Sequence, residues 1–426
     1  MPTEVITFGC RLNAYESEVI KNNLDASGLE DAVVFNTCAV TKEAERQAKQ
    51  QIRKYIRNNP NAKVIVTGCG AQINPQQYSE IQGVFSVIGN EEKMKAETFA
   101  GIAKKDPLND FGTEKILVND IFSITETASH LITNMEDKAR AFMQVQNGCN
   151  HRCTFCIIPY GRGNSRSVPV GEIVAQAQLL VKQNFKEIVL TGVDITDYGL
   201  DLPGKPTLGA MIRRLLKLVP QIERLRLSSV DVAEIDQDIF WLVENEARFM
   251  PHFHLSLQSG DDMILKRMKR RHLRKDILNF AEKVRGLRPD IVFGADIIAG
   301  FPTETDAMFQ NSLGIISEIG IIHGHIFPYS EREGTPAAKI PANKQVPQNI
   351  RKQRATILRD ACQGELSKFL STRVGKTENV IIEKNGLGRT EHFALTKLSA
   401  SYQPGSLVKV RIAETDGSKL IEIHQS

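Results

Sequence analysis

Several features that would place the chain in or across a membrane are missing. No apolar run approaches the ~18 residues that a membrane-spanning helix needs. The N-terminus, MPTEVITFGC, has no basic region followed by an apolar core, so it does not read as a secretory signal. Both absences predict a cytoplasmic protein with no membrane partner. Thiols stay reduced in that compartment, so clustered cysteines indicate metal ligands before disulfides.

Aromatic residues and excess charge are also scarce. One tryptophan and 6% aromatic residues argue against an extended stacking platform for single-stranded nucleic acid. The net charge of +4 allows a polyanionic partner but is too small to indicate one. With 41% hydrophobic and 24% charged residues, the composition is that of a globular protein. A length of 426 residues predicts about two to four domains.

The first hundred residues alternate between two kinds of segment. Residues 4–9, 31–37 and 62–68 are short, apolar and β-branched, which is typical of buried strands. Residues 15–28 and 41–59 between them have the spacing of amphipathic helices. This strand–helix–strand alternation predicts a doubly wound parallel sheet.

Each of these three strands is followed by a cysteine, namely Cys10, Cys38 and Cys69. The carboxyl ends of parallel strands lie on one edge of a sheet, where open α/β sheets build their sites. The three thiols are therefore predicted to converge in space. The alternative is that each is a small buried thiol at a strand end, and spacing alone leaves both open.

A second alternating block predicts a partial (β/α)6 barrel or another open sheet. Helical patterns separate its six candidate strands, and a barrel would place its site at the strand carboxyl ends. The candidate strands are residues 142–148, 187–192, 224–229, 252–257, 292–300 and 324–330.

The end of the chain changes character again. Short strands between glycine-containing turns predict a small all-β barrel, an architecture often used to bind oligonucleotides, although it could also be a structural cap. The predicted organisation is an N-terminal domain at 1–105, a polar connection at 106–138, a barrel core at 139–370 and the small barrel at 371–426.

The segment GCNHRCTFC holds Cys149, Cys153 and Cys156. Thiolates in such a cluster favour zinc or an iron–sulfur cluster. Zinc would need a fourth ligand, but His151 is strained between two ligands and no second CxxC or HxxxH follows. Three incidental cysteines are the remaining alternative. The spacing favours a cubane cluster in which one iron has no protein ligand.

This CxxxCxxC pattern, with Phe155 before its last cysteine, resembles the radical S-adenosylmethionine (SAM) superfamily. In that superfamily the open iron binds the methionine part of SAM, which is cleaved to a 5′-deoxyadenosyl radical. Longer stretches resemble the methylthiotransferases within it. They are CTFCIIPYGRGNSRSVP, LTGVDITDYG, RLRLSS, LQSGDDMILKRMKRRH, DIIAGFPTET and HIFPYSEREGTPAA.

The same resemblance covers both ends of the chain. GCRLNAYESE, NTCAVTKEAERQ and VTGCGAQ match the N-terminal methylthiotransferase domain, which implies that Cys10, Cys38 and Cys69 hold a second [4Fe–4S] cluster. The first cluster, with SAM, is implied at Cys149, Cys153 and Cys156. The small C-terminal barrel corresponds to a TRAM domain.

The segment GCRLN at 9–13 resembles the MtaB-type branch, which acts on N6-threonylcarbamoyladenosine. The implied function is transfer of a methylthio group to carbon 2 of this base at tRNA position 37. Alternatives are the same chemistry on N6-isopentenyladenosine or on an aspartate of a ribosomal protein, and a non-catalytic metal-containing RNA-binding protein. The implied partners are tRNA, a sulfur source and an electron donor such as flavodoxin or ferredoxin.

Other candidate residues rest on less specific patterns. Candidates for contact with SAM are Phe155, Ser228, Ser229 and Pro302. Candidates for contact with RNA are Arg162, Arg166, Lys266, Arg267, Arg270 and Arg271, with surface pairing or a solvated helix end as the alternative. His252 and His254 alternate along one strand and are predicted to be packed rather than catalytic. Cys362 is predicted to be a plain buried thiol.

Overall fold

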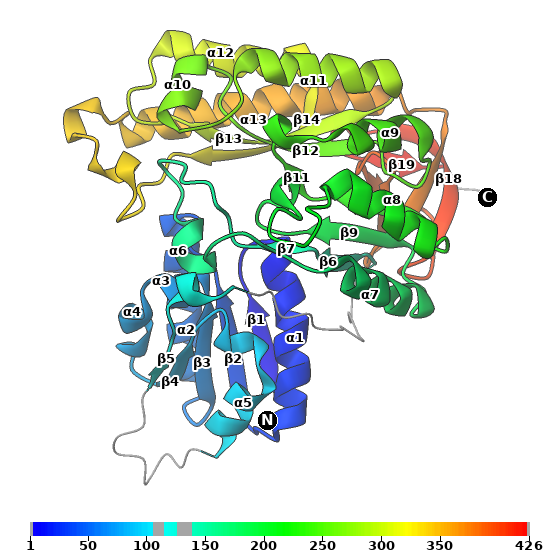
Figure 1. Ribbon diagram of the computed structural model, residues 1–426. Helices are drawn as coiled ribbons and strands as arrows, with labels where there is room; N and C mark the ends of the chain where they lie inside the picture. The colour runs from blue at the N-terminus through cyan, green and yellow to red at the C-terminus, as the bar shows by residue number, and fades with distance from the viewer. Residues whose placement is uncertain (1–2, 105–114, 126–138, 424–426) are drawn as a thin grey trace. The chain divides into compact units, whose positions relative to one another are not determined.

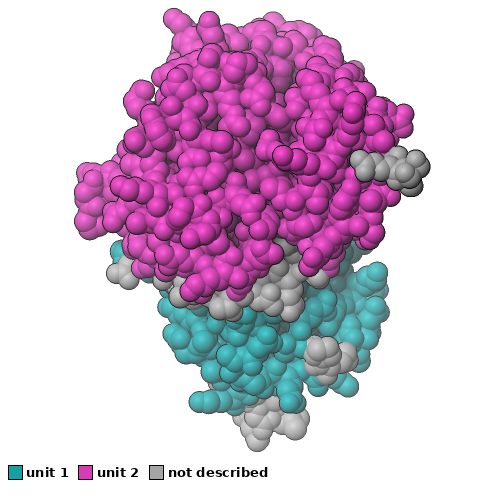
Figure 2. Space-filling model, turned by 90° about the vertical axis from the view of Figure 1, so that its right-hand side faces the viewer, with its two compact units in different colours: residues 1–134, 146–168, 331–338 teal, residues 135–145, 169–330, 339–426 magenta. Residues whose placement is uncertain are grey.

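The computed structural model describes residues 3–104, 115–125 and 139–423 (Figure 1). The chain divides into two compact units (Figure 2). Unit 1 comprises residues 1–134, 146–168 and 331–338, and unit 2 comprises 135–145, 169–330 and 339–426. Unit 1 therefore contains both the N-terminal residues and the loop that holds Cys149, Cys153 and Cys156. The domain boundaries expected from the sequence remain predictions. No helix among the described residues is long and apolar enough to cross a membrane.

Unit 1 contains a five-stranded parallel sheet whose strands follow one another in chain order. The strands are β1 (Glu4–Thr7), β2 (Ala32–Thr37), β3 (Lys63–Gly68), β4 (Val84–Ile88) and β5 (Ile116–Leu117). The expected strands are thus confirmed, and β5 is a short strand within the predicted connection. The rest of that connection, residues 105–114 and 126–138, lies outside the described residues.

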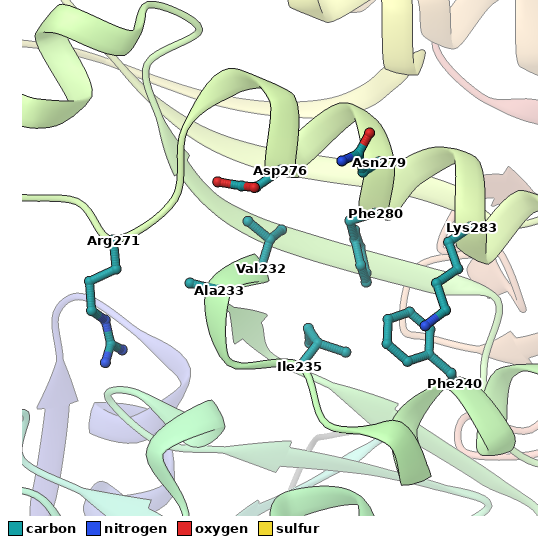
Figure 3. Close-up of a pocket in the computed structure, with 9 residues that line it drawn as sticks. All are labelled: Val232, Ala233, Ile235, Phe240, Arg271, Asp276, Asn279, Phe280 and Lys283. Carbon is teal, nitrogen blue, oxygen red and sulfur yellow. The ribbon is translucent and has the colours of Figure 1, made fainter.

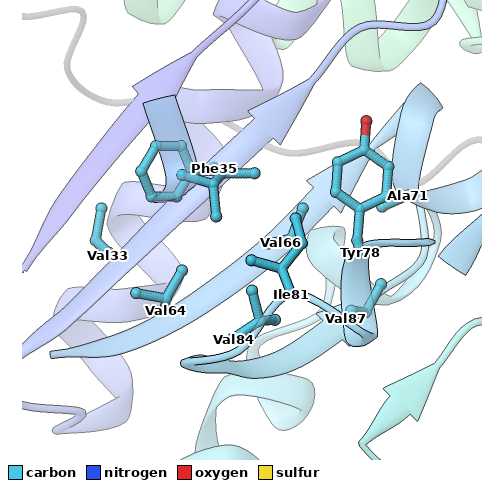
Figure 4. Close-up of a cluster of buried hydrophobic side chains, with 10 residues drawn as sticks. Val33, Phe35, Val64, Val66, Ala71, Tyr78, Ile81, Val84 and Val87 are labelled. Carbon is cyan, nitrogen blue, oxygen red and sulfur yellow. The ribbon is translucent and has the colours of Figure 1, made fainter. Parts of the chain in front are cut away.

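Helices cover both faces of this sheet because its strands are apolar on both sides. In β3, Val64 and Val66 join one core cluster and Ile65 joins another. The first cluster includes residues of α2 (Lys42–Asn58) and α4 (Pro75–Ser79), as Figure 4 shows in part, and the second includes residues of α1 (Arg11–Ser27) and α5 (Ala96–Ala103). The doubly wound architecture is confirmed.

Unit 2 contains parallel strands in two hydrogen-bonded groups, β6–β9–β10 and β11–β12–β13–β14. Only Ser228 separates β10 from β11, so the two groups continue as six parallel strands. This confirms the partial (β/α)6 arrangement. The bounds are β6 (Ala141–Gln144), β9 (Glu187–Thr191), β10 (Arg224–Leu227), β11 (Ser229–Val230), β12 (His252–Gln258), β13 (Val292–Ala299) and β14 (Ile321–Pro328).

Amphipathic helices connect these strands, as their spacing predicts. In Figure 1, α11 and α12 lie on the same side of the β12–β14 sheet. The connecting helices are α7 (Val170–Lys182), α8 (Leu208–Leu218), α9 (Gln237–Asn245), α10 (Asp262–Arg267), α11 (Arg274–Leu287) and α12 (Asp306–Ile319). A long helix, α13 (Gln348–Ser371), follows the last strand and leads to the small barrel.

The C-terminal strands close into a small barrel, which also belongs to unit 2. Its strand order is β15–β16–β17–β19–β18, and its core includes Leu370 from the last turn of α13. The barrel expected from the sequence is confirmed. Its strands are β15 (Thr377–Ile382), β16 (Leu387–Thr390), β17 (Leu395–Lys397), β18 (Leu407–Thr415) and β19 (Leu420–Glu422).

A buried group of charged residues joins the small barrel to the amino ends of the six strands. Glu187, the first residue of β9, accepts a 2.8 Å hydrogen bond from Arg226 and is fully buried. Arg226 also donates to the backbone oxygen of Glu391, and Arg224 donates to that of Asn379, both in the small barrel. Burial opposes ionisation of Glu187, but the arginines bring its carboxyl pKa below the usual value.

We predict that Glu187→Gln loosens the small barrel. The substitution leaves two buried guanidinium groups without their shared carboxylate, at a cost of about 3–5 kcal/mol. Hydrogen exchange should therefore lose protection in β15–β19. Glu223→Gln is the matched control, because Glu223 pairs with Lys186 at the surface and such pairs contribute about 0–1 kcal/mol. Equal protection in both variants would contradict the prediction.

Candidate active site

The three N-terminal cysteines lie at the carboxyl ends of neighbouring strands. Cys10 precedes α1, Cys38 follows β2, and Cys69 begins α3 (Cys69–Ile73) directly after β3. Gly9 has a φ of +97°, and a side chain there would place its Cβ 3.0 Å from the Cys38 sulfur. Burial, then the neighbouring Cys69 and Cys10 thiols, raise the pKa of Cys38 to about 11. The predicted convergence of these thiols is confirmed.

A two-stranded hairpin fixes the base of the loop with the second cysteine triplet. β7 (Gln146–Asn147) pairs with β8 (Arg166–Ser167), and the Gln146 side chain donates to the Gly148 oxygen at 2.7 Å. Gly148 has a φ of +72°, and a Cβ there would lie 1.8 Å from the Asn164 oxygen, so no other residue fits without a shift.

Within this loop a turn separates the last two cysteines, and a short helix begins after the third. The Cys149 amide donates to the Gly163 oxygen and the Cys156 amide to the Cys153 oxygen, both at 3.1 Å. Cys153 is buried, whereas Cys149 and Cys156 are partly exposed. Phe155, a predicted SAM contact, lies in the turn between the last two cysteines and is partly exposed.

Two short helices connect the two groups of cysteines within unit 1. α6 (Ile158–Arg162) begins two residues after Cys156 and contacts α3, whose first residue is Cys69. Ile157 and Cys69 belong to one buried apolar cluster, and a Cβ at Gly161 would lie 3.2 Å from the Cys69 Cβ. The two cysteine groups therefore share one packed helix pair.

Arg162, the last residue of α6, bonds directly to the N-terminal cysteine group. Its side chain is 2% exposed, and its Nε donates to the Cys69 sulfur at 3.1 Å. The same guanidinium pairs with Glu16 of α1. Burial would lower the pKa of Arg162, but Cys69 and Glu16 raise it well above its usual value. The prediction that Arg162 binds RNA is wrong, because this group is buried and bound within the protein.

The same correction applies to Arg166. Its side chain is buried and its guanidinium donates to the backbone oxygens of Asn164 and Arg162, at 3.0 and 3.1 Å. These bonds hold the end of the cysteine loop. Arg166 is therefore a structural residue of the loop rather than an RNA contact.

A second buried cation lies beside Glu16. Lys93 is fully buried, and its Nζ lies 2.6 Å from a Glu16 oxygen and 3.3 Å from the Asn36 side-chain oxygen. Two cations thus share one carboxylate next to three thiols. A net positive environment of this kind stabilises thiolates and other anionic sulfur. The donor set and its surroundings fit an iron–sulfur cluster.

The GCRLNAYESE stretch includes Glu16, but sequence reasoning gave that residue no role, and Lys93 has no local signal at all. The positions of Glu16 and Lys93 follow from the tertiary fold. It brings α1 and the turn before α5 to the edge of the sheet where Cys10, Cys38 and Cys69 lie. The one sequence signal that could have identified Glu16 is its place on the apolar face of an amphipathic helix, where a carboxylate needs a buried partner.

The predicted SAM contacts in unit 2 follow the last residues of β10 and of β13. Ser228 is buried between β10 and β11, Ser229 begins β11, and Pro302 follows β13. The Ser228 hydroxyl has no hydrogen-bond partner among the described residues. A buried unpaired hydroxyl at a strand end is suited to a ligand.

The basic run at 265–275 divides into exposed and buried members. Lys266, Arg267 and Arg271 are exposed. Arg270 is instead committed to Asp231, at 2.7 Å, and to the Ser256 oxygen, at 2.8 Å. The prediction that Arg270 binds RNA is therefore wrong.

A pocket of about 410 Å³ opens on the helical side of unit 2 (Figure 3). Arg271 is one of its lining residues, and Lys283 lies with its Nζ 3.4 Å from the centre of the Phe240 ring. The lining comes from α9, α11, the segment between β11 and α9 and the segment between α10 and α11. Three of its nine lining residues, Val232, Ala233 and Ile235, follow the carboxyl end of β11.

Two protein-family profiles match this chain, and each covers one of the two groups of three cysteines. The profile described as the radical SAM superfamily matches residues 143–315, and that described as uncharacterized protein family UPF0004 matches residues 3–89. A solved SAM methyltransferase, TsrM from Kitasatospora setae, shares the fold, with a TM-score of 0.58 at 14% identity over 79% of this chain and 74% of that one.

Curated relatives match nearly the whole chain. The threonylcarbamoyladenosine tRNA methylthiotransferase MtaB of Rickettsia prowazekii is 54% identical over 96% of this chain and 94% of its own. The protein of the same name in Aquifex aeolicus is 36% identical over 95% and 98%. The tRNA-2-methylthio-N(6)-dimethylallyladenosine synthase of Acetivibrio thermocellus is 31% identical over 95% and 87%.

We predict that Glu16→Gln destabilises unit 1. The change leaves Arg162 and Lys93 buried without a counter-ion, which costs about 3–5 kcal/mol. Pulse proteolysis in urea should cleave the N-terminal region at lower denaturant concentration than in the wild type. Glu43→Gln, which removes an exposed carboxylate on α2, is the control and should leave cleavage unchanged. Indistinguishable cleavage of the two variants would refute the prediction.

Proposed function

The chain belongs to the threonylcarbamoyladenosine tRNA methylthiotransferase family of radical SAM enzymes, and we propose that it transfers a methylthio group to carbon 2 of N6-threonylcarbamoyladenosine at position 37 of tRNA. The observation that supports this most is 54% identity, over 96% of the chain, to a relative of that name. The relative named for the dimethylallyl substrate is 31% identical, which favours the threonylcarbamoyl base over the isopentenyl one.

Membership of the radical SAM family implies a [4Fe–4S] cluster and SAM. We assign the ligands of that cluster to Cys149, Cys153 and Cys156, on a loop whose base is fixed by the β7–β8 hairpin. When bound with SAM, this cluster supplies radical chemistry, which an unactivated aromatic C–H requires because no acid–base route exists at neutral pH. Phe155, Ser228, Ser229 and Pro302 are the proposed SAM contacts.

A second [4Fe–4S] cluster is proposed at Cys10, Cys38 and Cys69, where sulfur for the substrate would be held. Its support is the convergence of the three thiols and the buried cations beside them. Arg162 donates to the Cys69 sulfur and so orients that ligand. In this proposal the surrounding residues bind and neutralise anionic sulfur and exclude water from it.

The remaining partners follow from the chemistry. Position 37 lies in a single-stranded loop, so turning the base out of its stack costs only a few kcal/mol. The small C-terminal barrel and the exposed Lys266, Arg267 and Arg271 are the proposed tRNA contacts. The reaction also requires an electron donor such as flavodoxin or ferredoxin and a source of sulfur. The tRNA substrate makes the cytoplasm the proposed location.

We predict about eight irons and eight sulfides per chain in the anaerobically prepared enzyme, because two cubane clusters are expected. Cys69→Ala and Cys156→Ala should each reduce the iron content to about half. Cys362→Ala is the matched control, since Cys362 is a buried thiol on α13 outside both groups. Finding one or two zincs per chain in place of the iron would refute the clusters.

We predict that deletion of the gene removes the 2-methylthio form of threonylcarbamoyladenosine from tRNA, as measured by nucleoside analysis. If this nucleoside persists in a strain in which no other enzyme makes it, the proposed substrate is wrong.

We predict that the triple variant Lys266→Ala, Arg267→Ala, Arg271→Ala weakens tRNA binding in a salt-dependent way. Each lost phosphate contact should make the slope of log K against log salt shallower by about 0.7–0.9. Filter binding across a salt series measures this slope. The control is Arg214→Ala with Lys217→Ala, which removes exposed charges from α8. A triple-variant slope equal to that of the control would exclude this surface as a tRNA contact.

A further inference from the structure

Three ionisable side chains from adjacent strands meet on the inner face of the unit 2 sheet. They are His254 of β12, Asp296 of β13 and His325 of β14. Their strand neighbours Phe253 and Phe293 pack against Phe280 of α11, with ring centres 5.3 and 6.3 Å apart. Side chains alternate along a strand, so the three ionisable groups face away from the α11 side. They share the side that a (β/α) barrel uses as its interior.

Both histidines bind the same carboxylate oxygen. Nε2 of His254 lies 3.0 Å from Asp296 Oδ1, and Nδ1 of His325 lies 3.2 Å from it. The His254 side chain is 5% exposed, that of Asp296 is 23%, and that of His325 is 57%. Burial opposes ionisation of Asp296, but these two hydrogen bonds bring its pKa well below the usual value. Asp296 is therefore ionised and accepts both hydrogen bonds. His325 is the solvent-exposed histidine of the pair.

The hydrogen bonds determine where the protons lie. An ionised carboxylate only accepts hydrogen bonds, so His254 carries a proton on Nε2 and His325 carries one on Nδ1. A second proton on His325 can only be on Nε2, on the far side of the ring from Asp296. In that form the ring presents a charged N–H donor to the exposed side, held in place by Asp296.

The other side of this trio is closed by protein. His252 and His323 lie two residues nearer the amino ends of β12 and β14, with their ring centres 5.5 and 5.8 Å from that of Phe393. Phe393 comes from the turn between β16 and β17 of the small barrel, and Arg226 stacks on its ring at 5.1 Å. Burial lowers the pKa of His323 to about 3, so that ring is neutral. Among the described residues the amino-end side of the trio is thus closed, and His325 is the member most exposed to a ligand.

We propose that His325, held by Asp296 and His254, binds the carboxylate of the threonylcarbamoyl group of the substrate base. This inference rests on the proposed function and identifies what selects the substrate side chain. The threonyl part ends in a carboxylate, whereas an isopentenyl group is uncharged. A site built to bond a charged group discriminates strongly against a substrate that lacks it.

The donor of this arrangement matches the charge of the substrate. In the form with a second proton on His325, Nε2–H is a charged donor on the side away from Asp296, and the substrate carboxylate accepts its hydrogen bond. A carboxylate bound to an imidazolium N–H is a charge-assisted hydrogen bond, with a net value of about 1.5–3 kcal/mol, or roughly 10- to 100-fold in affinity. His325 is a specificity residue in this scheme, and Asp296 and His254 are positioning residues.

The test uses the reconstituted holoenzyme and two anticodon stem–loops. One has threonylcarbamoyladenosine at position 37, and the other has its carboxamide, which keeps the shape but loses the negative charge. Binding is measured by fluorescence anisotropy, and methylthiolation gives kcat/KM. The wild type should prefer the acid over the amide by about tenfold or more. His325→Ala should lose that preference while binding the amide as the wild type does.

Two further variants sharpen the result. His325→Lys keeps a positive charge and should retain preference for the acid. Lys182→Ala, which removes an exposed cation at the end of α7, should leave both affinities unchanged. Equal losses on acid and amide in His325→Ala would overturn the proposal, as would a stoichiometric divalent metal that disappears in that variant. If the wild type methylthiolates neither stem–loop, the proposed function itself fails.

Discussion

The ion pair between Arg162 and Glu16 is the interaction on which the site depends. Arg162 belongs to the loop with the second cysteine triplet, and Glu16 belongs to the first helix of the chain. Their pairing, with Lys93 beside it, places a buried positive charge against Cys69. A guanidinium group can be buried here because the Glu16 carboxylate and the Cys69 sulfur accept its hydrogen bonds. The charge that would neutralise a cluster is thus part of the fold itself.

A similar arrangement recurs in unit 2, where Glu187 sits among Arg224, Arg226 and the small barrel. In both places a single fully buried carboxylate pairs with two cations, which come from two distant segments around Glu16 and from one strand around Glu187. Around Glu187, the cations donate to backbone oxygens of the small barrel and so attach it to the amino ends of the strands. The Phe393 turn that this attachment brings inward also closes the barrel interior beneath the histidines.

The sequence was informative where periodicity or a motif applied. Alternating apolar segments predicted the parallel sheet, the six strands and the small barrel, and strand ends predicted the meeting of Cys10, Cys38 and Cys69. The arginines were harder, because a basic residue near a motif looks the same whether it faces RNA or a buried carboxylate. Arg162, Arg166 and Arg270 are the three for which this distinction fails. Arg162 and Arg270 are bound by residues far away in the sequence, whereas Arg166 is bound by the backbone of its own loop. His254 was correctly expected to be packed, but its bond to Asp296 arises only from strand register.

The packing of α3 against α6 has a consequence for how the protein is made. The three N-terminal cysteines leave the ribosome early, yet their surroundings are incomplete until Arg162 has been synthesised and has folded back. Even the cysteine loop gains a contact from far downstream, since the Ala337 amide donates to the Thr154 oxygen. A cluster inserted during translation would meet an open, uncompensated group of thiols. Loading of the cluster proposed at the N-terminal site would therefore follow synthesis of Arg162 and its docking on Glu16 and Cys69.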